Sequence, residues 1–225
     1  MKILGDACNL ILKMDKTLID ILYVTFRMAI SSSVISLIIG LPIGIIFGYK
    51  NFKIKNFFII LNRTLMGMPP VVCGLLCYLM FSGVGPLRHL RLLYTVEGMI
   101  IAQVLLITPI VIGTMEPFIK KLYPEMNDTI EGIHINGIKK ILLLINESKY
   151  EIVSVYLFAL SRALAEVGAV SMVGGAIIFK TNVMTTAIMN YTNMGDFNMA
   201  MALGIILMLI SLVVNIFANI LQGNS

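Results

Sequence analysis

Long apolar runs separated by short charged segments dominate the hydropathy pattern of this 225-residue chain. A helix of about 20 apolar residues is long enough to cross the hydrocarbon core of a bilayer. Runs of this kind lie at about 19–48, 57–81, 98–118, 152–178 and 199–221. The pattern predicts an all-α membrane protein with five transmembrane helices in one domain, 19–221. A segment of mixed polarity, 1–18, precedes this domain, and a short tail, 222–225, follows it.

The second run is interrupted by Gly67-Met68-Pro69-Pro70. Proline lacks a backbone N–H and clashes with the preceding turn, so this sequence must bend or break the helix. Within a bilayer such a break is tolerated only where protein or a water-filled cavity satisfies the freed carbonyl groups. Broken helices near the middle of the bilayer recur in transport paths. Pro69 and Pro70 therefore indicate either a transport path or a kink that serves packing alone.

The fourth run contains two opposite charges, Arg162 and Glu166, at a spacing that places both on one face of a helix. Ser161, Ala165 and Ala169 lie beside them, and small residues four apart let helix backbones approach closely. An ionisable residue inside a membrane helix is costly and usually marks a functional site or a buried pair. We therefore expect Arg162 and Glu166 either to organise a polar path or dimer centre, or to form an internal ion pair that holds helices together.

The composition agrees with a membrane protein, since 58% of the residues are hydrophobic, 13% are charged and the mean hydropathy is +0.93. A water-soluble domain would carry about 25% charged residues, so that class is excluded. Three cysteines give no disulfide framework, and Cys73 and Cys77 are predicted to be small core residues. His89 and His134 lie in polar segments without the spacing of metal ligands, so neither a metal site nor the catalytic constellation of a membrane enzyme is predicted.

Positive charge is divided unevenly between the two sides of the predicted membrane domain. The polar segments 49–63 and 119–151 hold nine Lys and Arg residues, against six in the segments on the opposite side. Cytoplasmic loops carry the excess of Lys and Arg, so the N-terminus is predicted outside the cell membrane, with segment 1–18, and the C-terminus inside. The net charge of +5 reflects these loops rather than nucleic-acid binding.

The polar segment 119–151 is the longest in the chain, and Ile138–Ile145 within it is apolar apart from two lysines. This stretch is too short to span a bilayer. It predicts a short helix outside the membrane, with an apolar side available to a partner protein.

The order of three spans, a charged cytoplasmic segment and two further spans resembles the permease subunits of binding-protein-dependent ABC importers with the type I fold. Those permeases carry a Glu-Ala-Ala-x-x-x-Gly loop that docks on the ATPase. Here Glu131 and Gly137 keep that separation, while Gly132 and Ile133 replace the two alanines. The resemblance implies that Glu131, Gly132 and Gly137 belong to a coupling loop at about 119–151. The alternative is an ordinary solvated loop.

A second match lies in the fourth run. Oxyanion permeases commonly show Arg-Ala-Leu-x-Glu-x-Gly-Ala, and Arg162–Ala169 fits this pattern throughout. Val170–Gly175 and Arg63–Gly67 are similar to the tungstate branch of that family, which implies an importer of tungstate or molybdate. An acid facing a passing oxyanion would repel it, so the internal ion pair is favoured for Glu166. Five residues are assigned either to the translocation path or to the helix core that the internal ion pair holds together. They are Pro69, Pro70, Arg162, Glu166 and Gly168.

The resemblance also implies partners. Such permeases form a homodimer in membrane lipid around one path, with two ATPase subunits on the cytoplasmic side and a substrate-binding protein outside. This chain has no Gly-x-x-x-x-Gly-Lys-Ser/Thr phosphate loop, so ATP is expected on the ATPase. Neither a cofactor nor enzymatic activity is expected of the chain itself. The alternative function is a secondary carrier or channel, which would need no ATPase.

Arg88, His89 and Arg91 form a basic cluster in the predicted outer loop. Long-range attraction by such a cluster would draw an oxyanion or an acidic surface of the binding protein. A solvated group of charges is the commoner explanation, and the sequence leaves both open.

Overall fold

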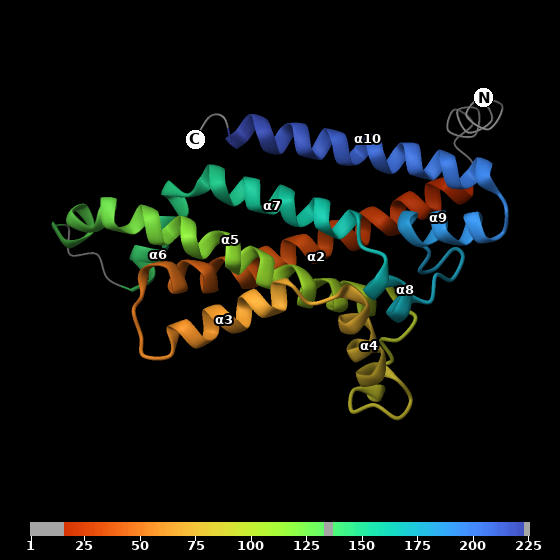
Figure 1. The fold of residues 1–225 in the computed structure, drawn as a ribbon, viewed down its shortest axis with the longest axis horizontal. Helices are drawn as coiled ribbons and strands as arrows, with labels where there is room; N and C mark the ends of the chain where they lie inside the picture. Colours follow the sequence, from red (N-terminus) through yellow and green to blue (C-terminus); the bar gives the residue numbers. More distant parts are fainter. Residues whose placement is uncertain (1–15, 133–136, 223–225) are drawn as a thin grey trace.

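The computed structural model describes residues 16–132 and 137–222, which form helices and no strand (Figure 1). The elements are, in chain order, α2 (Lys16–Tyr49), α3 (Lys55–Met66), α4 (Pro70–Phe81), the 3-10 helix η1 (Arg88–Leu90), α5 (Val96–Gly132), α6 (Ile138–Glu147), α7 (Lys149–Leu164), α8 (Gly168–Gly174), α9 (Met184–Asn193) and α10 (Phe197–Gln222). Most of the predicted segment 1–18 lies outside the described residues, as do Ile133, His134 and 223–225.

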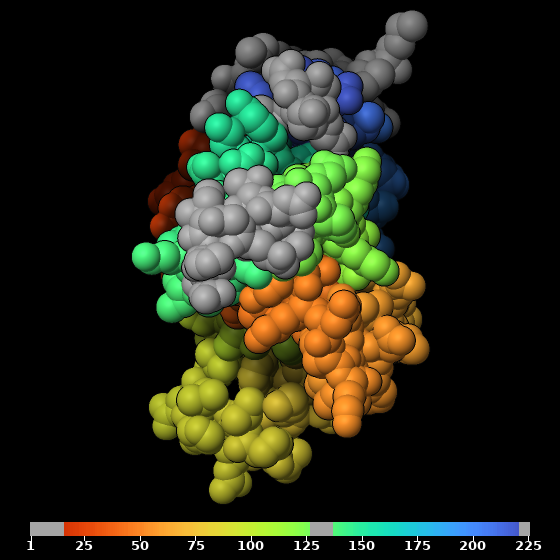
Figure 2. Space-filling model, turned by 90° about the vertical axis from the view of Figure 1, so that its left-hand side faces the viewer, coloured from red at the N-terminus to blue at the C-terminus, as the bar shows by residue number. Residues whose placement is uncertain are grey.

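Three helices are long and apolar enough to cross a membrane unbent, namely α2, α5 over Val96–Met126 and α10 over Phe197–Ile220. The second and fourth predicted spans are bent pairs, α3 with α4 at 97° and α7 with α8 at 59°. If each pair is one span, the total is the five that the apolar runs predict. Helices α2, α5, α7 and α10 run alongside one another in Figure 1, whereas α4 turns away from them after the predicted break at Pro69 and Pro70. Viewed from the end of the bundle, α3 and α4 lie on the same side of it (Figure 2).

A ladder of glycines brings α2 and α5 together. Gly40, Gly44 and Gly48 repeat at four-residue spacing on the face of α2 that meets α5. A Cβ atom on Gly44 would lie 2.8 Å from the Cβ of Met115, and one on Gly40 would lie 2.9 Å from that of Val111. Close backbone contact at small residues stabilises helix pairs in lipid. Apolar side chains gain little free energy there by exchanging lipid contacts for contacts with another helix. The two helices therefore form one tightly packed pair.

The third span is predicted to end near residue 118, but α5 continues to Gly132. The first part of the predicted coupling segment, 119–132, is therefore helical. Ile119 is fully buried, and Tyr123 and Met126 pack against the same core cluster. These apolar residues recur at helical spacing among charged ones, so one face of the extension stays in the core. The charges mark the solvent side of a helix and not a loop.

A further helix, α9, occupies part of the loop predicted after the fourth span. Its first turn is buried, and Met184 donates its backbone N–H to Thr25 Oγ1 on α2 at 2.9 Å. Thr185 is also buried, and its hydroxyl donates to the carbonyl of Glu166 at 2.8 Å. Polar residues predict a loop here, but their hydroxyl groups are satisfied inside the bundle.

Candidate functional site

The charged motif of the fourth span lies at the break between α7 and α8. The sequence predicts Arg162 and Glu166 on one continuous helix, and this is wrong, because α7 ends at Leu164 and α8 begins at Gly168. Arg162 lies in the last turn of α7, and Glu166 lies in the break itself. The two side chains nevertheless form an ion pair, with Arg162 Nη1 2.7 Å from Glu166 Oε2.

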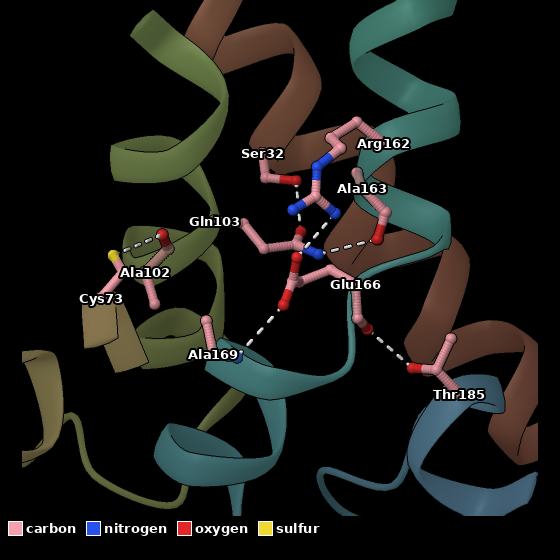
Figure 3. Close-up of polar contacts among 9 residues, drawn as sticks. All are labelled: Ser32, Cys73, Ala102, Gln103, Arg162, Ala163, Glu166, Ala169 and Thr185. Atoms are coloured by element: carbon pink, nitrogen blue, oxygen red, sulfur yellow. Dashed lines mark hydrogen bonds and ion pairs between the residues drawn. The ribbon is translucent and has the colours of Figure 1, made fainter. Parts of the chain in front are cut away.

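Glu166 joins the helices around the break (Figure 3). Its Oε1 accepts the backbone N–H of Ala169 at 3.2 Å, and this bond satisfies a donor in the first turn of α8. Its backbone carbonyl accepts the hydroxyl of Thr185 on α9. The Glu166 side chain is 4% exposed, so protein groups rather than water compensate its charge, whereas the Arg162 side chain is 32% exposed.

Gln103 on α5 satisfies a carbonyl at the end of α7. Its Nε2 donates to the carbonyl of Ala163 at 2.8 Å, and its Oε1 accepts the hydroxyl of Ser32 on α2 at 2.6 Å (Figure 3). Gln103 and Ser32 are both fully buried. A helix end inside a bilayer requires such partners. The break is therefore held by α2, α5 and α9 together.

The break between α3 and α4 lies beside the break between α7 and α8. Helix α4 starts at Pro70, and a Cβ on Gly168 would lie 2.8 Å from Val71 Cγ2. One turn along α4, a Cβ on Gly74 would lie 2.7 Å from the Cα of Ala169. The structure thus brings the predicted prolines and the predicted charged motif to one place.

Cys73 and Cys77 lie on the face of α4 that packs into the bundle. Both are buried with free thiols, as predicted for small core residues, and the Cys73 thiol donates to the carbonyl of Ala102 on α5 at 3.7 Å. Within the described part of the chain no group of three His, Cys, Asp or Glu side chains could hold a metal ion.

The residues of the predicted coupling loop flank the segment 133–136. Glu131 and Gly132 end α5, and the side chain of Glu131 lies outside what the structure describes. Gly137 precedes α6 with φ of 59° and ψ of −125°. The predicted short helix at 138–145 is present as α6 and extends to Glu147.

The basic cluster of the predicted outer loop is separate from the breaks. Arg88 and His89 lie in η1, and Arg91 follows it with φ of 49°. All three side chains are exposed. Among the described residues, no hydrogen bond or ion pair joins this cluster to Arg162 or Glu166, so its role in attracting anions stays a prediction.

Sequence reasoning did not identify Gln103, Ser32 or Thr185 as part of the site. The sequence does carry a signal for Gln103, because an amide side chain in the middle of an apolar run is costly in a bilayer unless it has a hydrogen-bond partner. Serine and threonine carry a weaker signal, since their hydroxyl groups can bond to the carbonyl one turn earlier in their own helix.

Comparison with known proteins places the chain among transport proteins. No model of a protein family matches it. It is 35% identical over 216 residues to a tungstate uptake system permease protein of Peptoclostridium acidaminophilum, covering 96% of this chain and 95% of that protein. The permease protein of the tungstate uptake system of Campylobacter jejuni is 34% identical, covering 96% and 91%. A probable anion ABC transporter permease protein of Haloferax volcanii is 33% identical, covering 88% of both chains.

Proposed function

This chain belongs to the family of ABC transporter permease subunits, and on that premise we propose that it forms the translocation path of a tungstate importer. It is a multi-pass membrane protein and not an enzyme, because the ATPase of such a transporter is a separate subunit. The observation that supports tungstate as the substrate is the 35% identity to a tungstate permease over nearly the whole of both chains. A secondary carrier or channel finds no support in these relationships.

We place the path at the two neighbouring breaks, because backbone that is not helical is tolerated in a bilayer only inside protein or beside water. An anion arriving there would meet Arg162, which is 32% exposed, and not Glu166, which is 4% exposed and turned toward α8. This supports Arg162 as the anion contact and Glu166 as the residue that orients it. The residues that shape the breaks around them are Pro69, Pro70 and Gly168.

We place the contact with the ATPase at α6 and the end of α5. Ile138 and Leu142 lie on one face of α6 and are 76% and 59% exposed, which supports docking on a separate protein. Gly137 has a positive φ, which a residue with a side chain adopts only under strain. Glu131 and Gly132 precede this turn in the same segment of the chain. ATP is held by the docked subunit.

A second copy of the chain is the proposed partner of α4. This helix leaves the bundle at the 97° bend, beside the paired breaks (Figures 1 and 2). Its Val71, Leu75, Leu76 and Leu79 are between 44% and 54% exposed. A homodimer would bury these side chains next to the path. The substrate-binding protein is expected on the outer side of the membrane, and the exposed Arg88 and Arg91 of the predicted outer loop support a contact there.

Reconstitution of the permease with its ATPase and binding protein tests this function. ATP-dependent uptake into proteoliposomes is expected for tungstate, with weaker uptake of molybdate and little of sulfate. A matched preparation with a hydrolysis-deficient ATPase controls for leakage. Uptake that continues without ATP hydrolysis would support a carrier or channel, and preference for sulfate would contradict the proposed substrate.

A further inference from the structure

Helix α6 has two faces that differ in their contacts. Ile138 and Leu142 lie one turn apart on the outer face and are largely exposed. Lys140 and Leu144 lie one turn apart on the opposite face, where Leu144 is fully buried in the core. Lys139, the neighbour of Lys140 in sequence, is exposed. Two adjacent lysines therefore have different surroundings, one at the solvent and one between helices.

Lys140 is bound by two tyrosines from two other helices. Its Nζ donates to the hydroxyl of Tyr123 on α5 at 3.1 Å and lies 5.3 Å from the centre of that ring. It also lies 5.7 Å from the ring centre of Tyr49, the last residue of α2. The two rings pack together with centres 5.6 Å apart. The hydrogen bond to the Tyr123 hydroxyl joins the ammonium group to α5, and a cation within about 6 Å of a ring face is attracted by the ring quadrupole, as at Tyr49 on α2. One ammonium group therefore links three helices.

This link differs in kind from the other attachment of α6. Leu144 is buried in the core and Ile141 and Ile145 pack against the same cluster, and this apolar burial has no preferred direction. The N–H···O bond from Lys140 to Tyr123 is directional, and the Tyr49 ring attracts the ammonium group only over its face. Lys140 therefore fixes the orientation of α6 relative to the ends of α2 and α5.

The pair of helices that Lys140 binds leads to the charged break. Helices α2 and α5 are packed along the glycine ladder and hence move together. Further along the same two helices, Ser32 and Gln103 bond to each other, and Gln103 holds the carbonyl of Ala163 at the end of α7. Direct contacts thus run from the outer face of α6 to the residues around Glu166.

We propose that Lys140 is the positioning residue that transmits movement of the docked ATPase from α6 to the α2 and α5 pair. The inference rests on the proposed function, in which α6 contacts the ATPase. Without the ammonium group, the ATPase would still bind the outer face of α6 and hydrolyse ATP. The movement of the ATPase would then shift α6 over its apolar contacts with less displacement of the α2 and α5 pair. Lys140 therefore governs how many anions cross for each ATP hydrolysed.

The test compares Lys140→Met with Lys139→Met in the reconstituted complex. Methionine keeps most of the length of the side chain and removes the charge. Lys140→Met is expected to lower the ratio of tungstate uptake to ATP hydrolysis by about three- to tenfold, as estimated for loss of one partly desolvated cation–π site with its hydrogen bond. The ATPase should co-purify in the normal amount. Lys139→Met should leave the ratio of uptake to hydrolysis unchanged, because the ratio does not depend on how much ATPase is bound, and Lys140→Arg, which keeps a cation, should retain most of the ratio.

An unchanged ratio in Lys140→Met would overturn the proposal. So would an equal fall in Lys139→Met, which would show a general effect of charge, or loss of the ATPase from Lys140→Met, which would make Lys140 a docking residue. If Lys140→Met does not fold, Tyr123→Phe removes the acceptor and keeps the ring, and a fall of about twofold is expected. Failure of the wild-type complex to take up tungstate with ATP would contradict the proposed function instead.

Discussion

At the scale of single residues, the two charges of the fourth span have different surroundings. Glu166 is almost completely buried, whereas about a third of the Arg162 side chain is exposed. The break explains this difference, because it turns the carboxylate toward the N–H of Ala169 and leaves Arg162 on the last turn of α7. The ion pair holds the guanidinium at a fixed point, and its exposed side remains accessible to another anion.

Replacing Arg162 with alanine is expected to reduce ATP-dependent tungstate uptake by about tenfold or more, because a hydrogen bond to a charged group contributes about 1.5–3 kcal/mol. Uptake by reconstituted complexes, normalised to the amount of permease, is the measurement. Arg162→Lys keeps the charge without the planar fork and should lie between the wild type and Arg162→Ala. Both variants should co-purify with the ATPase. Normal uptake by Arg162→Ala would remove this residue from the path.

Glu166→Ala is expected to destabilise the protein by about 1–3 kcal/mol, because the buried N–H of Ala169 loses its acceptor and Arg162 loses its partner. Glu97→Ala is the matched control. Glu97 forms an ion pair of 2.8 Å with Arg27, but both side chains are about half exposed, and such a pair contributes less than about 1 kcal/mol. Thermal unfolding of the purified variants compares them. Equal melting temperatures would contradict the role given to Glu166.

At the scale of elements, adjacent prolines mark a bend between two helices, whereas glycines allow two other helices to pack closely. The adjacent prolines Pro69 and Pro70 coincide with a 97° bend, whereas α2 and α5 remain helical through single prolines such as Pro42 and Pro109. A lone proline in a membrane helix is tolerated where neighbouring helices satisfy the freed backbone groups. Bending is thus concentrated at the two breaks, and the tightly packed α2 and α5 provide the frame around them.

Gly44→Ala is expected to lower stability by about 1–3 kcal/mol, because the added Cβ would lie 2.8 Å from the Cβ of Met115 and force α2 away from α5. Gly204→Ala on α10 is the control, since nothing lies within 4 Å of the added atom there. Alanine has the higher helix propensity, so Gly204→Ala should leave stability unchanged or raise it by up to about 1 kcal/mol. Melting temperatures of the two variants measure the difference, and a similar change in both would argue against the glycine ladder.

At the scale of the whole molecule, the features predicted from the sequence are those encoded within one segment. The apolar runs, the proline break and the ion pair of Arg162 with Glu166 each arise from neighbouring residues. The contact of Gln103 with Ala163 joins residues 60 apart, and only assembly of the helices creates it. The extension of α5 is not predicted, because its charged residues indicate a polar segment and its buried face consists of only a few residues at helical spacing.

The distribution of positive charge predicts that the two ends of the bundle face different compartments, with the turn before α3 in the cytoplasm. Lys53 lies in that turn, and Lys180 lies in the exposed turn before α9 at the other end. In a variant with Cys8 replaced by serine, Lys180→Cys is expected to react with a membrane-impermeant thiol reagent on intact cells. Lys53→Cys should react only after lysis. The reverse pattern would place the N-terminus inside.

The ion pair of the fourth span has a consequence for how the chain enters the membrane. A lone charge at the centre of an inserting helix costs about 2.5–3.5 kcal/mol. Arg162 and Glu166 are synthesised within moments of each other and belong to one inserting segment, whereas Gln103 is made earlier and Thr185 later. We therefore expect the segment to leave the translocon with its two charges compensating each other, which requires neither Gln103 nor Thr185.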